Sequence, residues 1–130
     1  MADNTSVYVK LTGPVLEGRA PEIVETMLVS AISEVADYAK FEVLMQLNEV
    51  LQHPTGHYES QITDQTIQPT LHRIHDNGVI YGPWLEGVGS RNYPATRFKG
   101  YHTFRIVKNR MQQKARAIVE AHLERVRAEL

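Results

Sequence analysis

The sequence predicts a single α+β domain, in which two long helices pack on an antiparallel sheet of three to four strands. Two long stretches have apolar residues at every third or fourth position, and several short stretches alternate apolar with polar residues. A length of 130 residues with 42% hydrophobic content suits one domain with its own core, covering residues 1–130. A chain of this length leaves no room for a two-domain enzyme.

The first expected element is a short edge strand over residues 6–12. Val7, Val9 and Leu11 alternate with residues suited to solvent, which is the period of two of a half-buried strand. A Gly-Pro pair follows and ends the strand.

A long helix is expected from Pro21 to about residue 52. Pro21 suits the first helical turn, because its missing N–H has no partner within the helix there, and Glu22 and Glu25 stabilise the positive end of the helix dipole. Apolar residues then recur at helical spacing, among them Ile23, Met27, Ala31, Ile32, Val35, Tyr38, Ala39, Val43, Leu44, Leu47 and Leu51. About thirty residues correspond to about 45 Å. That length leaves two alternatives open, a kink or a partner subunit that covers part of the helix.

Three further strands are expected after this helix, over residues 57–64, 70–75 and 79–81. The first alternates but has few apolar members, which fits a solvent-facing or interface strand. Asn77-Gly78 predicts a tight turn before the last strand, because both residues tolerate a positive φ, and Asp76 is interpreted as part of that turn. Turn residues dominate from there to about residue 99, so a loop with one short helical turn is expected.

A second long helix is expected from about residue 101 onward. Apolar residues keep a helical stripe, formed by Phe104, Val107, Met111, Ala115, Ile118, Val119, His122, Leu123, Val126 and Leu130. Basic residues lie mostly off this stripe. Five of them form the candidate charged surface of the helix, namely Arg105, Lys108, Arg110, Lys114 and Arg116.

Charge is divided unevenly along the chain. Residues 1–90 carry 12 acidic and four basic side chains, a net charge of −8, whereas residues 91–130 carry ten basic and three acidic ones, a net charge of +7. The total is −1. Such a chain can neutralise itself internally, attract an anionic partner, or stack head to tail with copies of itself. The sequence leaves these three alternatives open.

The residues that could carry chemistry give no sign of catalysis. The absence of cysteine excludes disulfides, thiolate metal sites and thiol nucleophiles. His72 and His75 are the closely spaced histidines, and on a strand they point to opposite faces, so they cannot readily share a metal ion. No phosphate-binding loop, dinucleotide-binding glycine pattern or hydrolase motif is present. We therefore expect no enzyme, no cofactor and no metal.

Membranes and secretion are not expected either. No apolar run approaches the roughly 18 residues of a membrane span, and the polar start of the chain lacks the features of a signal peptide. The default location is the cytosol. Besides a structural role, the sequence leaves two functions open. One is a nucleic-acid-binding module whose basic last helix contacts phosphates, and the other is a His-based hydrolase.

Three short motifs occur in a fixed order along the chain. They are Pro54-Thr55-Gly56 followed by Tyr58, Ser60 and Thr63, then residues 79–89 (VIYGPWLEGVG), then Pro94-Ala95-Thr96-Arg97-Phe98 ahead of the last helix. In this order and spacing the chain resembles the tail-component proteins of long-tailed bacteriophages, also called neck or tail-completion proteins. The resemblance covers about residues 20–130.

The resemblance implies a structural protein of the virion that is assembled in the host cytoplasm. Copies would form a closed ring, a hexamer by family likeness, between portal-side proteins and the tail tube. DNA would pass through the ring, and contact with it would not depend on sequence. Other neck proteins would be its partners.

In such a ring we expect the loop of residues 81–98 to pack over the sheet and to bridge subunits. The expected interface residues are Tyr81, Trp84 and Glu86 as anchors, with Arg91 and Arg97 reaching acidic groups of a neighbour. The alternative is a loop internal to the monomer, in which Trp84 fills the core.

Overall fold

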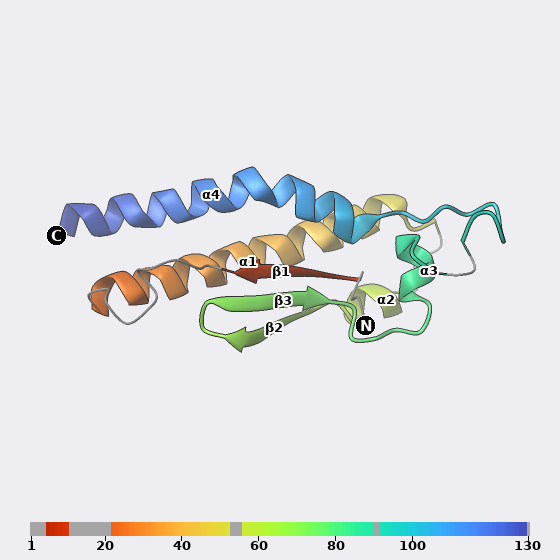
Figure 1. The fold of residues 1–130 in the computed structure, drawn as a ribbon, viewed down its shortest axis with the longest axis horizontal. Coiled ribbons are helices and arrows are strands. Elements are labelled where there is room, and N and C mark those ends of the chain that lie inside the picture. The colour runs from red at the N-terminus through yellow and green to blue at the C-terminus, as the bar shows by residue number, and fades with distance from the viewer. Residues whose placement is uncertain (1–4, 11–21, 53–55, 90–91, 130) are drawn as a thin grey trace.

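The computed structural model describes residues 5–10, 22–52, 56–89 and 92–129 (Figure 1). It confirms the α+β fold, with two long helices packed on each other and on a three-stranded antiparallel sheet. The two long helices, α1 (Glu22–Val50) and α4 (Thr103–Glu129), run antiparallel along the length of the molecule (Figure 1). Pro21, expected in the first turn of α1, lies outside the described residues.

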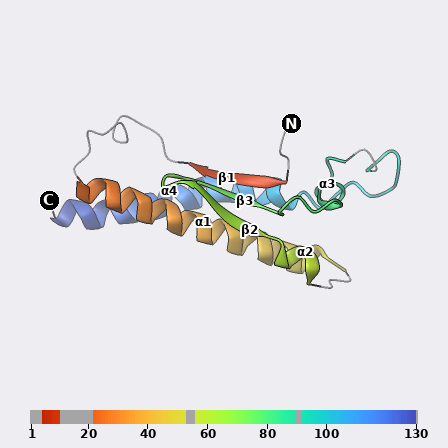
Figure 2. The same cartoon turned by 90° about the horizontal axis from the view of Figure 1, so that it is seen from below.

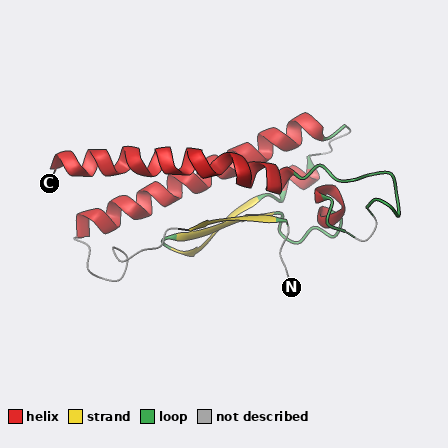
Figure 3. Cartoon of the chain, turned by 45° about the horizontal axis from the view of Figure 1, so that its top comes forward, coloured by secondary structure: helices red, strands yellow, loops and turns green. Residues whose placement is uncertain are grey.

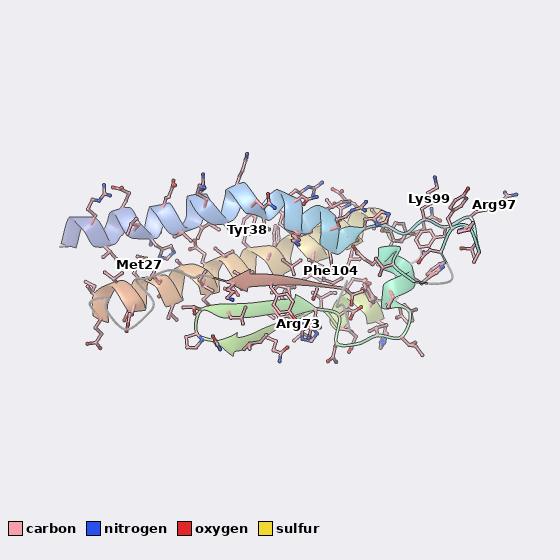
Figure 4. All side chains as sticks on the ribbon, in the orientation of Figure 1. Met27, Tyr38, Arg73, Arg97, Lys99 and Phe104 are labelled. Atoms are coloured by element: carbon pink, nitrogen blue, oxygen red, sulfur yellow. The ribbon has the colours of Figure 1, made fainter. Side chains whose placement is uncertain are left out.

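The contact between α1 and α4 forms one side of the core. α1 is a single uninterrupted helix of 29 residues, and Ala31, Ala36 and Ala39 on it have no exposed surface, which lets neighbouring elements approach closely. The main core gathers around Val43, Leu47, Phe104 and Val107. Figure 4 shows that Phe104 lies beside the sheet, whereas Met27 lies at the far end of the helix pair, where it belongs to a second, smaller cluster with Leu28, Ala31 and Val126.

The sheet packs on the helices by one face. Its strands are β1 (Ser6–Lys10), β2 (Thr63–Gln68) and β3 (Leu71–His75), in the order β1-β3-β2, so that β1 and β2 are both edge strands. Val7 and Val9 of β1 and Ile74 of β3 point inward and are buried. Figures 2 and 3 show that no described element covers the opposite face of the sheet. The predictions of an edge strand near the start of the chain and of a strand within residues 70–75 are confirmed.

The strand expected over residues 57–64 is wrong except at its last two residues. His57–Ser60 forms a short helix, α2, and β2 begins only at Thr63. Tyr58 and Ile62 are buried at 5% and 3% exposure, and their spacing of four is that of a helical turn. The sequence did not indicate this turn, because residues 57–64 contain too few apolar side chains to distinguish a helical period from the alternation of a strand.

The strand expected over residues 79–81 is also wrong, so the sheet has three strands among the described residues. Two consecutive turns replace it, closed by hydrogen bonds from the Val79 N–H to the Asp76 carbonyl at 3.4 Å and from the Gly82 N–H to the Val79 carbonyl at 2.9 Å. Ile80 is 94% exposed at the tip of these turns. Val79 packs against the core and the Tyr81 ring lies 5.8 Å from that of Tyr58, so these two side chains make their contacts from turns and not from a strand.

Asp76 is a turn residue as predicted, and its buried carboxylate also accepts hydrogen bonds from three other residues. Its carboxylate accepts the Gly78 N–H at 3.1 Å, which closes the turn, and the Tyr58 hydroxyl at 3.0 Å. The Thr5 hydroxyl donates to it at 3.4 Å. Burial and the nearby Asp76 raise the pKa of Tyr58 well above its usual range, so the phenol stays a donor. A Cβ at Gly82 would collide with the Asp76 carboxylate, so this site requires glycine.

Truncation of Ile74 to alanine tests the packing of the sheet on the helices. Ile74 has no exposed surface, so Ile74→Ala should lower the free energy of unfolding by about 2–5 kcal/mol. Ile67→Ala on β2 is the matched control, because that side chain is 44% exposed and should cost less than about 1 kcal/mol. Urea denaturation measures both. Equal costs at the two positions would contradict the assigned inner face.

Candidate functional site

The end of the molecule beyond the sheet is formed by residues 81–89 and 92–102, which we call the end loop. It includes a short helix, α3 (Gly82–Glu86), and Figure 1 shows it projecting past the end of the sheet. The expectation that it packs over the sheet is therefore not met. The reason is the pair of turns at residues 76–82, which carries the chain away from the sheet where a fourth strand was expected.

The base of the end loop is closed by backbone contacts. The Tyr101 N–H donates to the Leu85 carbonyl at 2.7 Å and the His102 N–H to the Glu86 carbonyl at 3.1 Å. Gly87 and Gly100 pass against each other with φ of 98° and 96°, and a Cβ on either would collide with backbone atoms. These two glycines allow the two ends of the loop to touch.

Asn92 holds the interior of the end loop. It is 5% exposed, and its side-chain amide donates to the carbonyls of Trp84 at 2.8 Å and Phe98 at 3.3 Å. Its side-chain oxygen accepts the Gly89 N–H at 2.9 Å, and the Tyr93 N–H donates to the Phe98 carbonyl at 2.9 Å. Asn92 could not be identified from the sequence, because an asparagine among turn residues carries no signal of long-range hydrogen bonding.

Aromatic side chains stabilise the end loop and partly line its surface. The Phe98 ring lies 4.4 Å from that of Trp84 and 4.9 Å from that of Tyr101, measured between centroids. Trp84 remains 37% exposed and Tyr93 65% exposed. The loop therefore presents aromatic surface to solvent on a support fixed by its own hydrogen bonds.

Glu86 joins the end loop to the second long helix. It is 4% exposed, and its two carboxylate oxygens accept the backbone N–H groups of Phe104 at 2.9 Å and Arg105 at 3.1 Å. These N–H groups belong to the first turn of α4, where no partner exists within the helix. A carboxylate there also stabilises the positive end of the helix dipole.

The five predicted interface residues are divided between surface and interior. Tyr81, Trp84 and Arg97 are exposed, and Figure 4 shows Arg97 at the far end of the molecule beside Lys99. Glu86 is buried and holds α4 within the same chain. Arg91 lies outside the described residues. The prediction that Trp84 and Glu86 anchor the loop agrees with their contacts within one chain, whereas bridging between subunits stays a prediction.

The five basic residues of α4 do not form one stripe. Arg110 faces α1, where its guanidinium lies 3.2 Å from the Gln46 side-chain oxygen and 3.9 Å from the Glu42 carboxylate. The Lys114 ammonium lies 4.7 Å from the centroid of the Tyr38 ring, also on α1. On this flank Arg110 forms an ion pair with a carboxylate of α1, and Lys114 packs over an aromatic ring of the same helix.

The other flank of α4 faces β1. Lys108 and Arg116 line a groove of about 510 Å³ between α4 and this edge strand. Arg105 is exposed in the first turn of the helix, next to Glu86. The structure therefore brings together two separate pairs of basic residues and places the fifth at the end of the helix.

The two histidines of β3 lie on opposite faces of the sheet, as predicted. His72 Nδ1 lies 2.9 Å from an Asp64 carboxylate oxygen on the buried face, and His75 Nδ1 accepts the Asn77 N–H at 2.8 Å on the other. Burial lowers the pKa of His75. Among the described residues, no three histidine, aspartate or glutamate side chains are grouped as metal ligands. No helix there combines the length and apolar character needed to span a bilayer.

Comparison with protein-family models, curated proteins and solved structures finds no match to this chain. The candidate functional surfaces are the end loop and the two flanks of α4. The end loop exposes aromatic side chains and Arg97, and aromatic residues and arginine are enriched where proteins bind other proteins.

Removal of the Glu86 carboxylate should loosen the joint between the end loop and α4. Glu86→Ala leaves two backbone N–H groups without their acceptor, which should cost about 2 kcal/mol of unfolding free energy. Amide hydrogen exchange at Phe104 and Arg105 should accelerate. Glu124→Ala is the control, because that carboxylate is 66% exposed and its ion pair with Arg127 should contribute less than about 1 kcal/mol. Equal losses in the two variants would contradict the capping role.

Stability should also depend on the protonation of Glu86. Burial raises its pKa above the ordinary value of 4.5, against the opposing effect of the two backbone N–H groups and Arg105. The folded state thus holds the proton more tightly than the unfolded chain, and this contribution is lost as the pH rises through the raised pKa. Relative to Glu86→Gln, the wild-type chain should lose unfolding free energy as the pH rises from 4.5, measured by urea denaturation at several pH values. A relative gain would contradict the raised pKa.

Proposed function

We propose that this chain is a structural, non-catalytic protein of the junction between a phage head and tail. Copies of it form a ring, hexameric by resemblance, through which DNA passes. Its place is in the virion, at the neck or the top of the tail, and its partners are the proteins on the portal and tail-tube sides. The resemblance of its three motifs to neck and tail-completion proteins suggests this role.

One observation of the structure supports the proposal most directly, namely the fixed end loop with exposed aromatic and basic groups. A loop that projects beyond the body of a subunit can contact a neighbour without steric conflict between the two bodies. Asn92 and the backbone contacts at Gly87 and Gly100 fix the loop before binding, so little conformational entropy is lost on assembly. Trp84 and Tyr93 supply the kind of side chain that dominates interface energetics.

A ring also needs two different surfaces on each subunit, because the contact between neighbours is head to tail. The end loop is one such surface. The outer edges of β1 and β2, which no described strand pairs with, lie on opposite sides of the sheet and are candidates for the second surface. The division of charge between the two parts of the chain gives neighbouring copies complementary surfaces wherever it is not compensated internally.

Charge reversal at the tip of the end loop separates assembly from folding. Arg97→Glu should change the melting temperature of the monomer little, because an exposed charge contributes about 0–1 kcal/mol, and it should block ring formation. Arg127→Glu, on the distant end of α4, is the matched control. Native mass spectrometry and electron microscopy measure the assembly state. Under conditions in which the wild-type chain forms rings, ring formation by the Arg97→Glu variant to the same extent would count against a subunit contact by the loop.

Particle composition tests the place of the protein in the virion. Mass spectrometry of purified phage particles that encode this chain should detect it at about the copy number of one ring. A chain absent from the particles would defeat the proposal. A monomer in solution would not, because a neck protein can close into a ring only on the growing assembly.

The alternative function is a nucleic-acid-binding module, favoured by the exposed Arg105, Lys108 and Arg116 on α4. Three phosphate contacts would give a slope of log affinity against log salt of about −3 on a short DNA duplex. Lys108→Glu with Arg116→Glu would then lower duplex affinity and leave the assembly of DNA-free components unchanged. The structural proposal expects assembly itself to be impaired. Fluorescence anisotropy with a duplex and sedimentation without DNA distinguish the two functions.

A further inference from the structure

The groove between β1 and α4 is apolar at its floor. Ile32 and Val35 of α1 form the bottom, and Val9 of β1 and Met111 and Ala115 of α4 form the walls. Its volume is about 510 Å³, enough for several side chains. The groove runs alongside β1, so its shape suits an extended segment better than a compact ligand.

One wall of this groove is a strand edge. β1 pairs with β3 on one side, and among the described strands none pairs with it on the other, where α4 lies (Figures 1 and 2). An unpaired strand edge presents a row of backbone donors and acceptors that can pair with a further strand. A segment in the groove can thus satisfy its own backbone on β1 while its side chains reach the floor.

The rim of the groove is basic. Lys10 on β1 and Lys108 and Arg116 on α4 surround it, against a single carboxylate, Glu120. Neither Lys108 nor Arg116 forms an ion pair with another described residue, in contrast to Arg110 on the opposite flank. This flank of α4 therefore keeps positive charge that no described residue compensates by an ion pair.

We propose that the groove binds an extended segment of a partner protein, in which apolar residues alternate with aspartate or glutamate, as a fourth strand on β1. Alternate side chains of a strand point to opposite faces, so the apolar set enters the floor. The acidic set faces outward, toward the basic rim. β1 has five residues, so a segment of similar length matches it. This inference does not depend on the ring, because an isolated subunit keeps the groove.

The binding test uses the full chain and a synthetic peptide. The probe is an acetylated and amidated heptapeptide of alternating glutamate and valine, and the comparison peptide has lysine in place of glutamate. Saturation with the acidic peptide should slow amide hydrogen exchange of β1 and shift the NMR signals of Val9, Met111 and Ala115. The lysine peptide should bind at least about tenfold more weakly, which corresponds to about 1.4 kcal/mol. Equal binding of the two peptides would overturn the proposal.

Charge variants locate the peptide on the chain. Lys108→Glu with Arg116→Glu should weaken binding of the acidic peptide by about tenfold or more. Arg125→Glu with Arg127→Glu makes the same change of charge on the same helix away from the groove, and it should leave binding unchanged.

For the wild-type chain, binding of the acidic peptide should weaken between 0.1 M and 1 M salt as the screening length falls from about 10 Å to 3 Å. This measurement needs no variant. Salt-indifferent binding would contradict the assigned rim.

Other occupants of the groove give different results in the same experiment. If another part of the chain covers the edge, β1 amides are protected in the free protein at every concentration. If a second copy covers it, protection of β1 rises with protein concentration in the absence of peptide. Either outcome would overturn the assignment of a separate partner segment. Rapid exchange of β1 in the free chain, followed by protection with the acidic peptide, supports it.

Discussion

The position of the end loop depends on the hydrogen bonds between the Glu86 carboxylate and the N-terminus of α4. The first N–H groups of a helix have no partner within it, and here the acceptor comes from an element 18 residues earlier in the sequence. α4 is fixed in turn by its packing on α1. The hydrogen bonds to Glu86 therefore fix the end loop relative to the helix pair. The exposed groups of the loop are held at a defined distance from the sheet.

The two long helices were predictable, because their apolar patterns repeat over many residues. Short segments and long-range contacts were not predictable from the sequence. The apolar stripes of α1 and α4 extend over several turns, so their period was unambiguous. Residues 57–60 offered only Tyr58 as an apolar marker, and a helical turn there could not be told from a strand. Residues 79–81 have the composition of a strand, but Val79 packs on the core and Tyr81 on Tyr58 from a pair of turns, and only the three-dimensional arrangement shows this.

The candidate site was predictable in its residue types and not in its geometry. Exposed Trp84 and Arg97 could be identified from a turn-rich segment with aromatic and basic residues. The paired glycines, Gly87 and Gly100, could not, because each looks like an ordinary turn residue until the two backbones are seen in contact. Asn92 depends in the same way on carbonyl groups six and eight residues away.

The two flanks of α4 differ in how their basic residues are used. From the sequence, the basic end of the chain could be compensated internally or available to partners. The structure supports each alternative for a different flank, since Arg110 and Lys114 contact α1, whereas Lys108 and Arg116 face the groove beside β1. Charge compensated within a chain adds little to recognition, because binding would first have to break existing contacts. We therefore expect electrostatic attraction to the proposed partner segment to be concentrated on the groove flank, where an edge of β1 that no described strand pairs with would also orient the segment.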